Sequence, residues 1–131
     1  MKRFCYAIVS SLSLYIVLLL LDQLFHTQTA LLLLNIDFMI KSAPFIIELG
    51  LHVMAGVVLY YMLSILYRYR TLFKAALLVS LIQFIFLYFQ LTALAVTDSL
   101  VLSASGFIIW LAGHLVYLLI AARLIAIEHR T

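Results

Sequence analysis

The sequence predicts an all-α integral membrane protein in which four transmembrane helices form an up-down bundle within one transmembrane domain, residues 1–131. Hydrophobic residues make up 68% of the chain and charged residues only 10%, and a soluble domain of this size cannot bury so much apolar surface. The apolar residues fall into runs of roughly 20 residues, which suit membrane-spanning helices and not the roughly 10-residue alternating strands of a β-barrel. The charged residues gather mainly at the ends of these runs.

The first apolar run predicts a transmembrane helix over residues 4–25 that stays in the mature protein. Lys2 and Arg3 precede it, as basic residues also precede a secretory signal peptide. Its apolar part extends to Leu21, however, beyond the roughly 7–15 residues of a signal h-region. The residues that follow, DQLFHTQTA, contain no convincing small-x-small cleavage site.

Residues 27–43 predict a segment that lies in the interface. They are too apolar for an ordinary loop, yet too short and too interrupted to cross a bilayer, which favours a position against the outer face. Ser42 and Pro44 indicate the start of the next helix, because a serine hydroxyl can cap a helix and proline is tolerated in the first turn. We expect this second spanning helix over residues 44–67.

The remaining two helices are expected over residues 71–96 and 104–127. A very short basic turn separates the first of them from the helix before it, so these two helices should be antiparallel neighbours. Thr71 is a candidate cap for the helix over 71–96, and Ser103 is one of several candidate caps for the last helix.

The basic residues predict the orientation. Lysine and arginine favour the cytoplasmic side of a membrane, so we expect both termini and the short middle turn in the cytoplasm, in the inner (plasma) membrane of a bacterium. Seven of the eight basic residues fall on this side and only Lys41 on the other; the seven are Lys2, Arg3, Arg68, Arg70, Lys74, Arg123 and Arg130. Despite the net charge of +3, this placement of the basic residues at the ends of apolar runs predicts a lipid bilayer and not a nucleic acid as partner.

Polar residues inside the apolar runs predict a pocket that opens outward. At 1.5 Å per residue, Glu48 lies ~6 Å into its helix, His52 ~12 Å and His114 ~15 Å. Gln90 lies ~9 Å from the outer end of its helix, on a polar stripe. A strongly polar group that faces lipid costs ~2–3 kcal/mol or more, so these side chains should turn inward. The predicted ligand-binding residues are Glu48, His52, Gln90, His114 and Trp110.

The expected occupant of this pocket is a small ligand, a metal ion or a partner helix, and for a metal ion the candidate ligands can be named. Glu48 and His52 are four residues apart and share a helix face. His114, His26 or Asp22 could complete the coordination of a borderline ion such as zinc. The spacing is not that of the HExxH metalloproteases.

Haem and transport are two further interpretations. In an up-down bundle His52 and His114 come from diagonal helices and could ligate one haem from both sides, with Gly56 and Gly113 making room for the ring. The sequence contains no CxxCH attachment motif. Alternatively, Glu48 could exchange a proton for a substrate in a small transporter.

A structural role is the competing class of function. The chain would then be an accessory, immunity-type or assembly subunit of a homodimer or a larger membrane complex, and its polar residues would only fix helix packing. A nucleophilic enzyme is less expected than either class. Ser10, Ser11, Ser13 and the single cysteine, Cys5, belong to the cytoplasmic end of the first helix, which we expect to lie far from the histidines.

Overall fold

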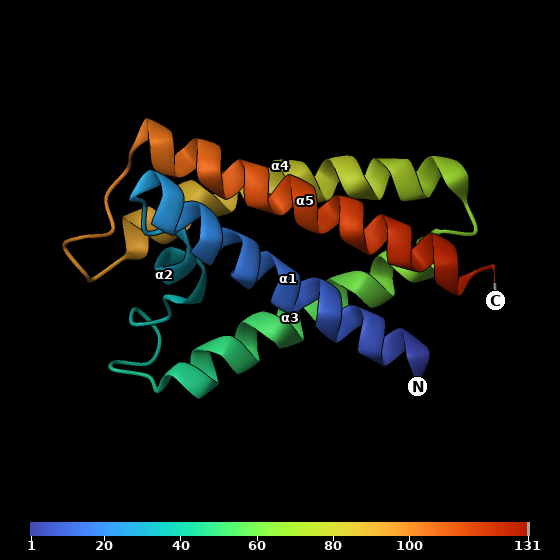
Figure 1. Ribbon diagram of the computed structural model, residues 1–131, viewed down its shortest axis with the longest axis horizontal. Coiled ribbons are helices and arrows are strands. Elements are labelled where there is room, and N and C mark those ends of the chain that lie inside the picture. Colours follow the sequence, from blue (N-terminus) through green and yellow to red (C-terminus); the bar gives the residue numbers. More distant parts are fainter. Residues whose placement is uncertain (131) are drawn as a thin grey trace.

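The computed structural model describes residues 1–130, and this part of the chain folds into helices without any strand. Four of the helices, α1, α3, α4 and α5, are long and apolar enough to cross a membrane. The prediction of an all-helical chain with four such helices is confirmed. The helices in chain order are α1 (Lys2–Phe25), α2 (Thr29–Leu34), α3 (Phe45–Leu66), α4 (Arg70–Leu94) and α5 (Ala104–Glu128), as Figure 1 shows.

The helix starts follow local chemistry, with two corrections to the sequence predictions. Ser103 caps α5, because its Oγ accepts a hydrogen bond from the backbone N–H of Gly106 at 3.0 Å. Ser42 does not cap α3: its φ of 55° turns the chain before the helix, and the N-cap position is held by Pro44 without a side-chain bond. Thr71 does not cap α4 either, since the helix already begins one residue earlier.

Helix α5 is the centre of the bundle, and α1 packs closely against it. A side chain at Gly113 would overlap Leu18 of α1, and one at Gly56 of α3 would overlap Ser11 of α1. Both glycines therefore allow α1 to approach its neighbours more closely than larger residues would permit. The buried residues of α5 recur every three or four positions: Gly106, Ile109, Trp110, Gly113, His114, Tyr117, Leu118, Ala121 and Ile125.

Helices α3 and α4 are much less buried. The buried residues of α4 are Ser80 and Tyr88, and those of α3 are Tyr60, Leu63 and Ser64. About half of the large apolar side chains on these two helices are exposed, as expected of surfaces that face lipid.

Helix α2 packs against all four long helices, at the end of the molecule opposite the two termini (Figure 1). Four of its six residues are buried: Thr29, Ala30, Leu32 and Leu34. The carboxylate of Asp22, one turn from the end of α1, fixes its start. It accepts hydrogen bonds from the backbone N–H groups of Thr29 and Ala30 at 3.0 and 2.8 Å.

Candidate functional site

A partly open cavity of ≈ 150 Å³ lies between the helices, and all five helices contribute to its wall. Most of the wall is apolar, with two imidazoles and two hydroxyl groups among the side chains. The lining residues are Ser11, Leu14, Leu33, His52, Ala55, Gly56, Leu59, Phe84, Leu87, His114 and Tyr117. We call this space the central cavity.

His52 of α3 and His114 of α5 both line this cavity. His52 Nε2 lies 3.1 Å from the backbone oxygen of Ser11 on α1. His114 Nδ1 lies 2.8 Å from the backbone oxygen of Trp110, one turn earlier on its own helix. Its ring centroid is 4.3 Å from that of Trp110 and 4.3 Å from that of Phe84. Both histidines are therefore held by a backbone carbonyl group.

Trp110 acts on the cavity through His114. It is fully buried and is absent from the residues that line the cavity. Its Nε1–H donates to the backbone oxygen of Phe84 at 2.9 Å, which ties α5 to α4. The ring of Trp110 thus positions the His114 imidazole, and a ligand beside His114 would lie within range of the tryptophan fluorescence.

Besides Trp110, two further predicted pocket residues do not reach the central cavity. Gln90 is exposed on α4, and Glu48 is half-buried near the start of α3, where its charge is close to that of Asp37. Neither side chain lines the space that His52 and His114 share. The chemistry of the cavity is therefore that of neutral side chains and not of a buried carboxylate.

The metal set predicted from the sequence is not assembled. Asp22 is engaged with α2: besides two backbone N–H groups, its Oδ1 accepts hydrogen bonds from the hydroxyls of Thr27 and Thr29 at 2.5 and 2.6 Å. His26 terminates α1 with a φ of 55° and lies outside the central cavity. Within residues 1–130, no group of three His, Cys, Asp or Glu side chains is arranged to hold a metal ion.

Haem also does not fit. A cavity of about 150 Å³ in another protein holds a single benzene molecule. The central cavity, at ≈ 150 Å³, is therefore large enough for one six-membered ring, whereas a porphyrin contains four pyrrole rings.

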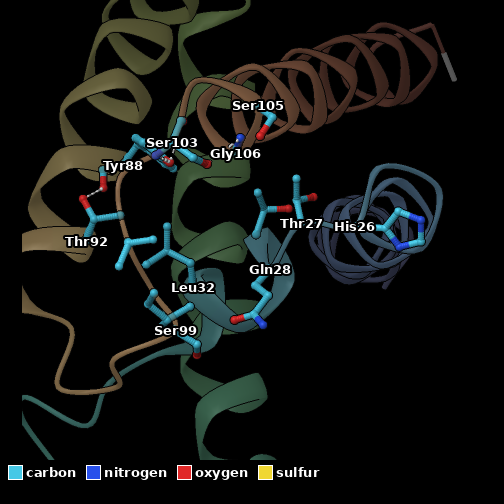
Figure 2. Close-up of a pocket in the computed structure, with 13 residues that line it drawn as sticks. His26, Thr27, Gln28, Leu32, Tyr88, Thr92, Ser99, Ser103, Ser105 and Gly106 are labelled. Carbon is cyan, nitrogen blue, oxygen red and sulfur yellow. Dashed lines mark hydrogen bonds between the residues drawn. The ribbon is translucent and has the colours of Figure 1, made fainter.

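A second cavity of ≈ 320 Å³ lies at the end of the bundle that carries α2 and the α4–α5 loop. Figure 2 shows Tyr88 and Thr92 on one side of it and Thr27 and Gln28 on the other. Tyr88 Oη donates to the backbone oxygen of Ser103 at 3.1 Å and accepts from its N–H at 3.2 Å, which closes one wall. The remaining polar groups are mostly exposed hydroxyls and amides.

One serine of α1 lies elsewhere than the sequence predicted. Ser10, Ser11 and Ser13 were expected far from the histidines, but Ser11 lines the central cavity and its backbone oxygen accepts the hydrogen bond from His52. The reason is that Ser11 lies about 14 Å along α1, near the middle of the helix, where α3 crosses it. Ser11 on α1 and Gly56 on α3 are both small residues that let the two helices approach closely. Their small size was the signal that could have predicted this contact.

A polar cluster that was not predicted from the sequence lies at the end of the bundle that carries both termini (Figure 1). Arg3 Nε donates to Glu128 Oε1 at 2.5 Å. The same carboxylate accepts hydrogen bonds from Tyr60 Oη at 3.3 Å and from Ser64 Oγ at 3.2 Å. One acidic side chain of α5 therefore joins α1 and α3.

No protein-family model matches the chain, and no curated protein or solved structure shows significant similarity to it.

Proposed function

We propose that this protein is a small integral membrane protein that binds a small molecule in the central cavity. The observation that carries the proposal is that His52 and His114, from two different helices, line one largely apolar cavity. Imidazoles inside membrane-spanning helices are rare, and they mark ligand, ion or proton sites. The size of the cavity and its apolar wall suit a ring-sized, membrane-soluble molecule better than an ion.

We further propose that the four long helices run up and down through a bacterial inner membrane with both termini in the cytoplasm. Two observations support this orientation. Both ends of the chain lie at the same end of the molecule (Figure 1), and most of the lysine and arginine residues belong to the termini or to the α3–α4 turn. Basic residues accumulate on the cytoplasmic side of membrane proteins. Under this orientation the central cavity lies within the bilayer.

Trp110 provides the assay for binding. It is the single tryptophan of the chain, and its ring lies 4.3 Å from that of His114, which lines the cavity. Toluene titrated into the purified protein in detergent micelles should cause a saturable change in tryptophan emission. The change reports occupancy of the cavity, because dissolution in the micelle alone does not saturate.

Two matched variants test whether the site is the central cavity. Ala55 is an exposed residue at the rim of the cavity, and Ala75 is exposed on α4 outside the lining. Ala55→Phe should fill the space and abolish the saturable change, whereas Ala75→Phe adds the same ring elsewhere and should preserve it. Equal responses from the two variants would exclude the central cavity as the site.

The second candidate function is that of an accessory or assembly subunit, with the polar residues serving only to fix helix packing. One observation favours it: the polar groups in the wall bridge helices. His52 joins α3 to α1 through Ser11, and Tyr117 joins α5 to α3 through its bond to the backbone oxygen of Gly56 at 3.3 Å. This function predicts that His52→Ala lowers thermal stability and that wild-type protein shows no cavity-dependent response to any small molecule.

A further inference from the structure

The four polar side chains in the wall of the central cavity have all used their hydrogen-bond donors within the protein. Two of them are hydroxyl groups. Ser11 Oγ donates to the backbone oxygen of Ala7 at 2.8 Å, and Tyr117 Oη donates to the backbone oxygen of Gly56 at 3.3 Å. A hydroxyl has one hydrogen, so each of these groups retains only its lone pairs for another partner.

The two imidazoles are also fixed in their tautomers. A backbone carbonyl oxygen can only accept, so the ring nitrogen beside it must carry the hydrogen. His52 therefore donates from Nε2 to Ser11, and His114 donates from Nδ1 to Trp110. A neutral imidazole has a single N–H. His52 Nδ1 and His114 Nε2 are consequently hydrogen-bond acceptors.

We propose that the central cavity selects a neutral, ring-sized molecule that donates a hydrogen bond, such as a phenol. This inference rests on the proposed function, since it names the chemistry of the molecule that the cavity binds. A ligand with only acceptor groups would face further acceptors, and its own polar group would lose hydration without compensation. A ligand with a hydroxyl group can instead donate to one of the two imidazole nitrogens.

The charge of the wall argues for a neutral ligand. The side chains that line the cavity include no carboxylate and no lysine or arginine, so an ammonium or carboxylate group would enter without a counter-charge. A zinc ion is also disfavoured, because two imidazole nitrogens fall short of the three or four protein ligands that zinc sites use. A neutral phenol satisfies both the size of the cavity and its excess of acceptors.

Phenol and anisole form the test pair, because methylation of the oxygen removes the donor and leaves the ring unchanged. Each is titrated into wild-type protein in micelles, and the dissociation constant is read from the Trp110 emission after correction for partition into the micelle. We expect phenol to bind about tenfold more tightly than anisole, the value of one hydrogen bond in a desolvated site. Para-octylphenol serves as a third ligand, because it carries the same ring on an alkyl chain. If it also binds in the cavity, the phenol ring that the protein recognises belongs to a lipid. If only phenol binds, the ligand is a free small molecule.

The acceptor nitrogens are tested with His52→Phe and His114→Phe, which keep an aromatic ring and remove the acceptors. If these nitrogens recognise the donor, the preference for phenol should fall to about twofold or less in at least one variant. His114 is almost fully buried, so its variant can fail to fold. In that case, two measurements still test the donor preference: the comparison of phenol with anisole in wild-type protein, and the same comparison in the variant of the half-buried His52.

The possible outcomes distinguish failure of the donor preference from failure of the proposed binding function. Equal affinities for phenol and anisole in wild-type protein, both lost in Ala55→Phe, would overturn the donor preference and leave the binding function standing. A response to neither ligand, or one that Ala55→Phe does not change, would overturn the binding function itself.

Discussion

Removal of the negative charge at Asp22 should loosen α2 without disrupting the four long helices. Asp22 Oδ1 accepts from Thr27, from the hydroxyl of Thr29 and from its N–H, and Oδ2 accepts from the N–H of Ala30 at 2.8 Å. Asparagine at this position keeps one acceptor oxygen. Its amide NH₂ group replaces Oδ2, however, and then faces the N–H of Ala30, so that two donors oppose each other.

The magnitude follows from the bond that is lost. A hydrogen bond to a charged group contributes about 1.5–3 kcal/mol when buried, and the value falls with solvent exposure. Asp22 is partly exposed, so we expect Asp22→Asn to lower the free energy of unfolding by about 1–2 kcal/mol. Asp22→Ala, which removes every acceptor, should cost more than Asp22→Asn.

Two measurements check the prediction. Thermal unfolding in detergent gives the global stability, and hydrogen exchange followed by mass spectrometry gives the local effect, which should be faster exchange in peptides that cover residues 27–35. Asp98→Asn is the matched control, because Asp98 is an exposed acid in the α4–α5 loop. Exchange of α2 at the wild-type rate in Asp22→Asn, or the same effect in Asp98→Asn, would contradict a role of the Asp22 charge in fixing α2.

Two further predictions concern packing and orientation. A Cβ at Gly56 would overlap the Ser11 side chain, whereas one at Gly50 of the same helix meets nothing within 4 Å. Gly56→Ala should therefore lower the melting temperature, because overpacking costs about 1–3 kcal/mol. Gly50→Ala should leave the melting temperature equal or higher, because alanine favours a helix. Equal melting temperatures for the two variants would contradict the close approach of α1 and α3. Cys5, the single cysteine, is exposed near the N-terminus, so a membrane-impermeant maleimide should label it only after permeabilisation of the cells. Ser99→Cys in a Cys5→Ser background should instead be labelled in intact cells. Labelling of Cys5 in intact cells would reverse the proposed orientation.

The helices could be predicted from the sequence because the length of an apolar run is a property of the chain alone. A run of about 20 apolar residues fits the bilayer whatever its neighbours are. The buried face of α5 also follows a local pattern: Gly106, Trp110, Gly113 and Tyr117 repeat at the spacing of a packed helix face, and all four are buried.

The rotation of α4 could not be predicted in the same way. The polar stripe suggested that Gln90 faces inward, but the buried residues of this helix are Ser80 and Tyr88. Gln90 comes two residues after Tyr88, which is about 200° around the helix. Burial of the tyrosine therefore turns the glutamine away. A large aromatic ring gains more from burial than an amide does, and polarity alone does not reveal that competition.

The hydrogen bonds of the central cavity depend on contacts between helices that no local pattern encodes. They also explain why histidine substitutions alone cannot separate the packing function from the binding function. His52→Ala would remove one of the contacts between α1 and α3, the bond to Ser11, and it would remove an acceptor from the cavity wall at the same time. Loss of stability and loss of binding would then appear together under either function. A change in the ligand avoids this difficulty: phenol and anisole encounter the same protein, so a difference between them reports the cavity and not the packing around it.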